Sequence, residues 1–465
     1  MIYGNLLAKI PQRPAVKVGI IGAGNYGTAI ITQSGAIPHY AITFVADMNL
    51  DAAKKACTQA GWDADSISVV ETEADVRRAR NLGKVVVTAF PELISACDVE
   101  VLVEATGNAD AGAASTLAAI GAGRHVVMVN KETDSVVGPI LTHKANAAGV
   151  VYTQADGDQP ALIIALCDWA KLLGLEIVAA GKSHDKELLL DREAKQVRIG
   201  EDTFPLEEDW IEVTRSIGGD VARVVEARRK VFGAKIATAN YDRIEIVCIA
   251  NATGLAPRTG PCSEPILRTP EIPQALCLTT EGGILERPGV LDTVCCLREP
   301  QVPTMGGGVF LVVRCENAYS REILHTKGLI TNRARSVGMI YRPYHLCGVE
   351  TPISIIAAAR LGVATGAREA RPLWDVVALA KKDLKAGTVI GGDLEYSDQL
   401  DSAYESHRVT KERKLLPLGM SGGLRLTQDV TVGMRLTEEM MEIPHDSLLW
   451  RLRREQDALF GTHSS

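Results

Sequence analysis

Residues 16–27 read VKVGIIGAGNYG and combine a strand-like run with a glycine-rich turn. The first six residues are rich in Val and Ile, a composition typical of a strand buried inside a parallel sheet. Gly22, Gly24 and Gly27 follow in the spacing Gly-x-Gly-x-x-Gly, and residues 28–34 are compatible with a helix. This order predicts a turn whose backbone lies close to a pyrophosphate at a helix N-terminus.

An acidic residue stands where this fingerprint requires one. The next β-like run, residues 42–46, ends at Asp47. A carboxylate at the end of the second strand binds ribose hydroxyls, and its charge would repel a 2′-phosphate. Asp47 therefore favours NAD, while the nearby cations Lys54 and Lys55 leave NADP open. The alternative reading is a glycine-rich turn in an unrelated α/β protein.

Further short apolar runs at residues 85–88, 99–103 and 125–129 extend the same domain. In open α/β sheets, ligands bind at the carboxyl ends of the strands. Here those ends carry residues 104–107, which read EATG, and residues 130–132, which read NKE. The predicted cofactor-binding residues are Gly22, Gly24, Asn25, Tyr26, Gly27, Asp47, Thr106 and Gly107.

Lys131 and Glu132 begin the segment after the run at 125–129. We predict that Lys131 is a catalytic residue facing the nicotinamide and that Glu132 contacts substrate. The alternative for Lys131 is a solvated loop lysine.

The pattern changes after residue 150. A polar segment at 153–160 opens an apolar helix, predicted over residues 161–173. Asp156 is a candidate catalytic acid or base and Gln159 a candidate substrate ligand; capping of the helix is the alternative for this segment.

A second polar cluster follows the strand predicted at 175–180. Residues 181–186 read GKSHDK and place Lys182, His184 and Asp185 together. Amine, imidazole and carboxylate groups at the end of a strand suit proton transfer and anion binding, so we predict all three to be catalytic. A charged surface turn is the alternative.

Residues 341–346 read YRPYHL and mix cationic, aromatic and imidazole groups. Arg342 and His345 are predicted to hold an anionic end of the substrate, with an inter-domain packing loop as the alternative. Residues 242–250 have the character of a strand or of a buried helix.

The last part of the chain contains a weak repeat. Residues 383–387 (DLKAG) match residues 429–433 (DVTVG), with Gly four positions after Asp in both. Two such turns predict a compact β module with a structural or assembly role. Residues 448–460 predict a final amphipathic helix.

Composition limits the partners. The 465 residues are 46% hydrophobic and 23% charged, with a formal net charge of −7. A mildly acidic chain has no field to collect nucleic acid or anionic lipid, so neither partner is expected, and an anionic substrate needs a local basic pocket. The ten cysteines include no Cys-x-x-Cys pair. We expect a cytoplasmic protein without signal peptide or membrane span.

Several of these segments together mark a family resemblance. Residues 22–27, 104–107 and 130–132 resemble the coenzyme domain of homoserine dehydrogenases. Residues 341–352 go further, and the repeat resembles a SAF domain. Over nearly the whole chain the sequence is similar to the 1-deoxy-D-xylulose 5-phosphate reductoisomerase-like enzymes.

This resemblance carries its own implications. The best-known member of that group converts 1-deoxy-D-xylulose 5-phosphate to methylerythritol phosphate, a step of isoprenoid biosynthesis, as an NADPH-dependent dimer. The resemblance thus implies NADP and a homodimer, and it leaves a divalent metal open, with no ligands assigned. Asp47 departs from the group by favouring NAD.

The expected architecture is α/β with three parts. A Rossmann domain spans 1–150, a substrate and dimerisation domain 151–365, and a small β-rich SAF-like domain with the final helix 366–465. The predicted function is an NAD(P)-dependent oxidoreductase on a small phosphorylated or polyhydroxy carbonyl compound. The alternatives are a hydroxy-acid or hydroxy-aldehyde dehydrogenase without isomerisation and a non-catalytic NAD(H)-binding sensor.

Overall fold

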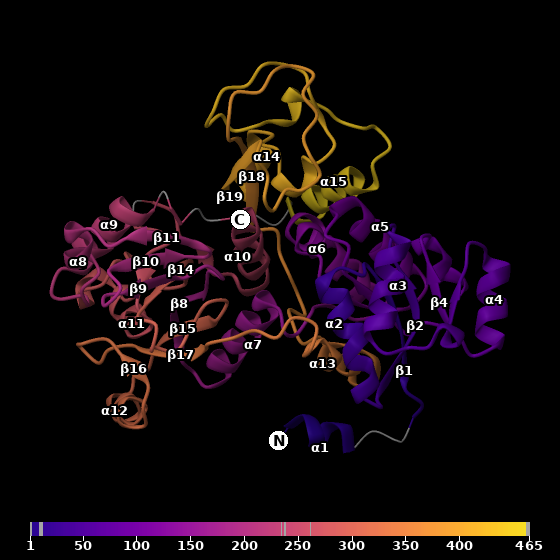
Figure 1. Cartoon of the computed structure of the whole chain (residues 1–465), viewed down its shortest axis with the longest axis horizontal. Helices are drawn as coiled ribbons and strands as arrows, with labels where there is room; N and C mark the ends of the chain where they lie inside the picture. The colour runs from indigo at the N-terminus through magenta and orange to yellow at the C-terminus, as the bar shows by residue number, and fades with distance from the viewer. Residues whose placement is uncertain (1, 9–12, 234, 237–238, 261, 462–465) are drawn as a thin grey trace. The chain divides into compact units, whose positions relative to one another are not determined.

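The computed structural model describes residues 2–8, 13–233, 235–236, 239–260 and 262–461 (Figure 1). The chain divides into two compact units. The first unit comprises residues 1–161, 346–372 and 443–465, and the second comprises 162–345 and 373–442. Among the described residues, no helix has the length and apolar composition needed to cross a membrane.

A seven-stranded sheet forms the centre of the first unit, and all its neighbouring strands are parallel. Its order is β3-β4-β2-β1-β5-β6-β7. The strands are β1 Val16–Ile21, β2 Tyr40–Ala46, β3 Ile67–Val69, β4 Val85–Thr88, β5 Val101–Glu104, β6 His125–Met128 and β7 Tyr152–Gln154. Chain order reverses between β1 and β5, which is the switch point where this class of fold binds ligands.

The helices of the first unit follow the strands in the βα alternation expected of a Rossmann domain. Helix α2 begins three residues earlier than the sequence indicated, directly after Gly24. The helices are α1 Ile2–Ala8, α2 Asn25–Gln33, α3 Leu50–Gln59, α4 Glu73–Asn81, α5 Ala109–Gly121, α6 Lys131–Ala147, α13 Thr351–Ile356 and α15 Leu448–Phe460.

Helix α6 contains Pro139, which has no N–H and disturbs the preceding turn. The amide of Gln456 on α15 bridges this place. Ile140 N donates to Gln456 Oε1 at 3.1 Å, and Gln456 Nε2 donates to the Val136 carbonyl at 3.0 Å. In an unbroken helix these two backbone groups would bond each other. The last helix thus replaces a hydrogen bond at the proline of α6.

The second unit is built on a mixed sheet in the order β11-β10-β9-β14-β8-β15-β17-β16, with two short strands also paired to β14. Strands β8 and β14 are parallel, and β15 is antiparallel to β8. The strands are β8 Glu176–Ser183, β9 Leu188–Asp191, β10 Gln196–Ile199, β11 Asp202–Pro205, β12 Ala256–Pro257, β13 Ile266–Leu267, β14 Val290–Arg298, β15 Val309–Arg314, β16 Ile330–Thr331 and β17 Gly338–Arg342.

Helices pack on this sheet with apolar side chains. Residues of α7 and α10 share a core with β8, β14 and β15, as Ile163, Ile246 and Leu311 illustrate. Residues 242–250, whose sequence has the character of a strand or of a buried helix, belong to helix α10. The α-helices of six or more residues in the described part of the second unit are α7 Gln159–Leu172, of which residues 162–172 belong here, α8 Glu208–Val213, α9 Val221–Phe232, α10 Asn240–Thr253, α12 Ala318–Thr326 and α14 His407–Glu412.

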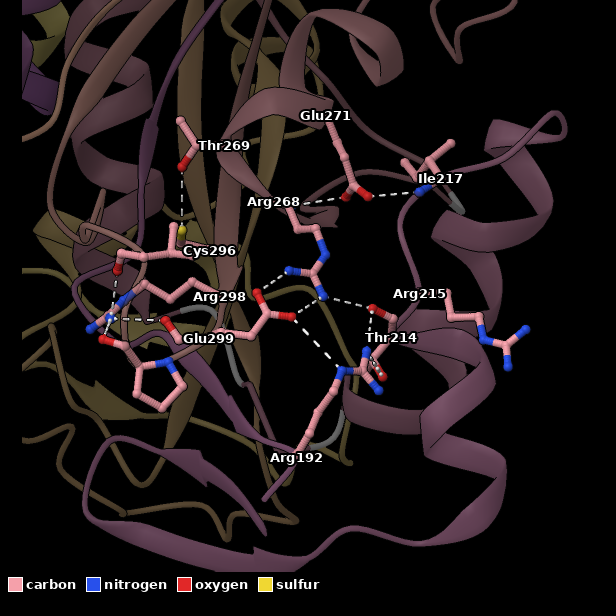
Figure 2. Close-up of polar contacts among 12 residues, drawn as sticks. Arg192, Thr214, Arg215, Ile217, Arg268, Thr269, Glu271, Cys296, Arg298 and Glu299 are labelled. Atoms are coloured by element: carbon pink, nitrogen blue, oxygen red, sulfur yellow. Dashed lines mark hydrogen bonds and ion pairs between the residues drawn. The ribbon is translucent and has the colours of Figure 1, made fainter. Parts of the chain in front are cut away.

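An arginine network holds one end of β14 (Figure 2). The guanidinium of Arg268 donates hydrogen bonds to both carboxylate oxygens of Glu299, at 2.5 and 2.8 Å, and to the Thr214 carbonyl at 2.9 Å. In the same network, the buried Arg228 donates to Glu271 at 2.6 Å. Each cation meets a carboxylate and backbone carbonyls, as a buried charge requires. We therefore read this cluster as structural.

Residues 373–442 contain two small antiparallel sheets. In the first, β18 Trp374–Ala380 pairs with β19 Leu400–Ser406, and in the second, β20 Arg425–Leu426 pairs with β21 Met441–Glu442. The two repeated turns cross-bond. Asp429 Oδ1 accepts from Ala386 N at 2.9 Å, and Asp383 Oδ1 accepts from Val432 N at 2.8 Å. Together with the two sheets above, these strands confirm the predicted fold class.

We predict that Gln456→Leu lowers the free energy of unfolding by about 1–3 kcal/mol, because the Ile140 N–H then stays buried without its acceptor. Urea denaturation followed by circular dichroism measures the change. Glu455→Ala is the matched control on the same helix, where an ion pair with Lys144 is half exposed and contributes little. Equal stability of Gln456→Leu and the wild type would contradict the bridge.

Candidate functional site

Gly22, Gly24 and Gly27, the three glycines of the Gly-x-Gly-x-x-Gly turn, are favoured at their positions for different structural reasons. A Cβ at Gly22, where φ is +100°, would lie 2.2 Å from the Ala105 carbonyl oxygen, and one at Gly27 would lie 2.0 Å from that of Gly22. These two positions exclude a side chain because the turn is tight. Gly24 differs, since a Cβ there meets no protein atom within 4 Å.

Gly24 is also the N-cap of α2, and no side chain caps that helix. The first N–H groups of a helix lack partners within the helix and suit an anion. An open glycine beside uncapped N–H groups therefore fits the pyrophosphate of a dinucleotide. Asn25, the first residue of α2, is exposed at the same place.

Asp47 follows β2 beside this loop. Its Oδ2 accepts from Ala23 N at 2.7 Å, and its Oδ1 accepts from Asn49 N at 2.8 Å. Each carboxylate oxygen keeps a further lone pair, so the group can still accept from ribose hydroxyls. The residues present fit a nicotinamide dinucleotide, with Asp47 at the ribose.

Tyr26 points into the first unit. Its hydroxyl donates to the Asp156 carbonyl at 3.3 Å and accepts from Thr351 Oγ1 at 3.1 Å. Burial is the largest cause that raises the pKa of this phenol well above its ordinary value. These contacts give Tyr26 a structural task in fixing the segment at 156, whereas its contact with a cofactor stays a prediction.

Thr106 and Gly107 form the loop after β5. Asn130 Nδ2 donates to Thr106 Oγ1 at 3.1 Å, and Asn130 Oδ1 accepts from Thr133 N at 3.0 Å as the cap of α6. One amide thus ties the β5 loop to the start of α6. The loop lies at the carboxyl edge of the sheet, where the sequence placed it.

Lys131 is the first residue of α6, and its side chain is 22% exposed. Its ammonium lies 3.5 Å from Asp158 Oδ2. Glu132 and Gln159 are buried nearby in the chain, as is Asp156, whose carbonyl also accepts from Thr351 Oγ1 at 2.9 Å. The structure thus brings Lys131 against Asp158, which was not among the predicted site residues.

The second unit buries a full charge inside its sheet. Lys182 lies within β8, two residues beyond the predicted end of that strand, and is 1% exposed. Its Nζ lies 2.8 Å from Asp242 Oδ1 and also forms an ion pair with Glu245. Burial alone lowers the pKa of this lysine, but the two carboxylates outweigh it and raise the pKa.

His184 completes this array. Its Nδ1 lies 2.9 Å from Asp242 Oδ2. Burial raises the pKa of Asp242, yet Lys182 and His184 more than offset this and hold it well below its ordinary value. Asp242 is therefore an ionised carboxylate that orients the imidazole, and it leaves Nε2 to exchange a proton.

Asp185 and His345 both lie against the glycine loop 304–308. His345 Nδ1 is 2.7 Å from the Gly307 carbonyl oxygen, and a Cβ at Gly307 would lie 2.8 Å from Asp185 Oδ1. Arg342, at the end of β17, stacks its guanidinium 4.7 Å from the ring centre of Tyr344. The structure thus brings Asp185 and His345 together.

Asp242 and Glu245 were not among the predicted site residues. They stand three apart on α10, and both are buried. Two acids inside the apolar run that ends at Ala250 are the local signal, because buried carboxylates require a cationic partner. Their partner lies on a strand distant in sequence, so spacing alone does not identify it.

A divalent metal has no evident place. No group of three or more His, Cys, Asp or Glu side chains in the described part of the chain is arranged to hold an ion. Lys182 occupies the space between Asp242 and Glu245, and an ammonium there competes with any cation. The residues present do not fit a metal, and no step below uses one.

Comparisons with known proteins found a similarity to one protein family over part of the chain. Residues 157–351 match the family model described as oxidoreductase DRL, catalytic domain. This range includes Lys182, His184 and Asp242. The match supports the prediction of an oxidoreductase. A comparison with curated proteins found no match.

Solved structures are more distant. A hyperthermophilic archaeal homoserine dehydrogenase in complex with NADPH shares 15% identity over 75% of this chain and 98% of that chain, with a TM-score of 0.39. A DOX-P reductoisomerase in complex with NADPH, fosmidomycin and magnesium shares 16% over 52% and 59%, with a TM-score of 0.31. GenD2 from gentamicin A biosynthesis in complex with NAD shares 19% over 39% and 48%, with a TM-score of 0.27.

The chain thus spans about half the length of such a structure as GenD2. At these TM-scores our fold assignment rests on the sheet topology described above.

The open position at Gly24 generates a test of the cofactor loop. Gly24→Val should fold like the wild type, because a Cβ at this position meets no protein atom within 4 Å, and should lose most affinity for NADH and NADPH. Gly35→Val is a matched control, since a Cβ there also meets no protein atom within 4 Å. Calorimetric titration measures binding, and unchanged affinity in folded Gly24→Val would sink the assignment.

Proposed function

We propose that this protein is an NAD(P)-dependent oxidoreductase that acts on the carbonyl or alcohol group of a small phosphorylated or polyhydroxy compound. One observation carries the proposal. A buried lysine and a histidine each lie within ion-pair distance of the same carboxylate, in the region that matches an oxidoreductase catalytic domain. Proton exchange coupled to charge stabilisation is what the interconversion of a carbonyl and an alcohol requires.

The cofactor half of the proposal rests on the first unit. Gly24, the uncapped start of α2 and Asp47 would hold the pyrophosphate and a ribose. When bound, the nicotinamide supplies or accepts a hydride. Residues of this chain must therefore manage the proton and the charge on the substrate oxygen.

His184 is the group that we assign to the proton. Asp242 Oδ2 lies 2.9 Å from Nδ1, and a proton on Nδ1 beside this carboxylate would leave Nε2 as the basic nitrogen. In oxidation Nε2 takes the proton of the substrate hydroxyl, and in reduction the imidazolium returns it to the oxygen. Asp242 acts through His184 and is a positioning residue.

Lys182 is the group that we assign to charge. Its ammonium holds Asp242 ionised, and it supplies a positive charge at a buried position. A fixed cation in such surroundings stabilises a developing alkoxide more strongly than it would in water. Glu245 shares the charge, so the ammonium stays in place through the reaction.

The anionic end of a substrate would be held by Arg342 and His345, beside the loop that carries Gly307. A guanidinium already stacked on Tyr344 loses little freedom on binding a phosphate or carboxylate. The resemblance to reductoisomerase-like enzymes makes 1-deoxy-D-xylulose 5-phosphate one substrate to test. Phosphorylated ketoses, hydroxy-aldehydes and hydroxy acids complete the panel, and turnover without rearrangement would favour the simple dehydrogenase.

The cofactor preference depends on Asp47. We expect Asp47→Asn, which keeps an acceptor for Ala23 N, to weaken NADH binding by about one to two decades and NADPH binding by less, because one charge-assisted bond is worth roughly 1.5–3 kcal/mol. Asp51→Asn, exposed on α3, is the control. A large preference of the wild type for NADPH would show that this carboxylate does not select the cofactor.

The chemical step depends on the two lysines. We predict that Lys182→Met and Lys131→Met each bind NADH normally and lose about two to three decades in kcat. Nicotinamide absorbance across the substrate panel measures turnover. Lys171→Met, exposed on α7, should behave like the wild type.

Since Lys182→Met leaves two buried carboxylates without their cation, His184→Gln provides a second variant, which should flatten the pH profile of kcat without loss of stability. Wild-type rates in all three site variants would place the chemistry elsewhere. Tight cofactor binding with no turnover by the wild type would favour the sensor.

A further inference from the structure

The first unit contains a second hollow that the proposed reaction does not use. A cavity of about 490 Å³ opens beside the amino ends of the parallel strands. Its lining includes Lys17 near the start of β1, Ile42 on β2 and Val85 at the start of β4. The volume is sufficient for a small organic molecule.

Cations dominate this cavity. Lys17, Arg77, Arg80 and Lys84 line it, and Asp98 is its single carboxylate. They come from three elements, β1, α4 and the turn after α4. A chain with a net charge of −7 places four positive side chains around one hollow, which is opposite to its overall balance.

The partners of these cations leave charge unused. Lys17 forms an ion pair with Asp98, and Lys17 is the largest cause that holds the pKa of Asp98 below its ordinary value. Arg80 Nη1 donates to the Ala96 carbonyl at 2.8 Å, which neutralises nothing. Arg77 meets Glu73 at 3.2 Å in an exposed pair. Lys84 has no side-chain partner among the described residues.

The cavity is separate from the cofactor loop. Strand β1 runs from Lys17 at the cavity to Ile21, next to Gly22 of the fingerprint. Four residue steps of a strand span about 13 Å. A ligand at the amino edge would therefore leave the carboxyl edge free for the dinucleotide.

We propose that this cavity is a binding site for a small phosphorylated molecule with at least two negative charges. The excess of cations over carboxylates sets the charge. A phosphate offers acceptor oxygens in several directions, whereas a carboxylate offers them in one plane, and the donors that line this cavity come from three elements. Ile42 and Cys97 supply apolar wall for the rest of the molecule.

Inorganic pyrophosphate is the probe, titrated calorimetrically into the full-length protein at low salt. We expect saturable binding that weakens about tenfold or more in Lys84→Gln and further in the Arg80→Gln, Lys84→Gln double variant. Lys84→Gln removes no protein contact, so its fold should persist. Arg78→Gln is the matched control, because this exposed arginine of the same helix does not line the cavity.

Gly24→Val separates this site from the cofactor loop, where pyrophosphate could also bind. The proposed component persists in Gly24→Val and disappears in the double variant. Citrate serves as a carboxylate probe and should bind more weakly. Absence of pyrophosphate binding at millimolar concentration, equal binding in the double variant, or tighter binding of citrate would each overturn the proposal.

Discussion

A buried ammonium cannot remain ionised in a protein core without opposite charge, and Lys182 meets this constraint near the carboxyl end of a β-strand. Asp242 and Glu245 supply the charge from one helix. Strand β8 and helix α10 must therefore keep a fixed register, since a slip of one residue would direct Lys182 to the opposite face. Removing Lys182 would leave two buried carboxylates without their cation, so this contact couples the position of α10 to the chemistry assigned to His184.

The same constraint explains why the array can be both rigid and reactive. Asp242 uses one oxygen for Lys182 and the other for His184. Because the Asp242 carboxylate is held from two sides, it has little freedom to rotate. It therefore also fixes the orientation of the His184 imidazole. Electrostatic preorganisation of this kind requires no rearrangement when charge appears on a substrate.

Local patterns predicted the parts of the fold that depend on neighbours in the chain. Residues 16–21 form a strand with the predicted bounds, and residues 448–460 form the predicted helix. The glycine spacing also located the tight turn before α2, because the steric reasons for Gly22 and Gly27 lie in the turn itself and in the neighbouring loop. The repeat at Asp383 and Asp429 forms a pair of cross-bonded turns, whereas the sequence predicted a compact β module without this pairing.

The sequence did not predict contacts between residues that are far apart in the chain. Residues 242–250 were ambiguous between strand and helix because an element buried all round loses the polar–apolar period. Lys182 and Asp242 are distant in sequence, and no local rule connects them. The cavity at Lys17, Arg80 and Lys84 was equally hidden, since its cations are scattered over three elements and each alone reads as a solvated side chain.

The bridge at Pro139 has a consequence for the order of biosynthesis. Ile140 and Gln456 are separated by 316 positions in the chain. At a synthesis rate of about 5–20 residues per second, this interval corresponds to about 16–60 s. During that time all strands of the Rossmann sheet have been synthesised, while α6 still lacks the Gln456 amide that bonds its backbone beside Pro139. The first unit is therefore completed only after translation has passed the whole of the second, and a nascent chain must tolerate an unfinished helix until then.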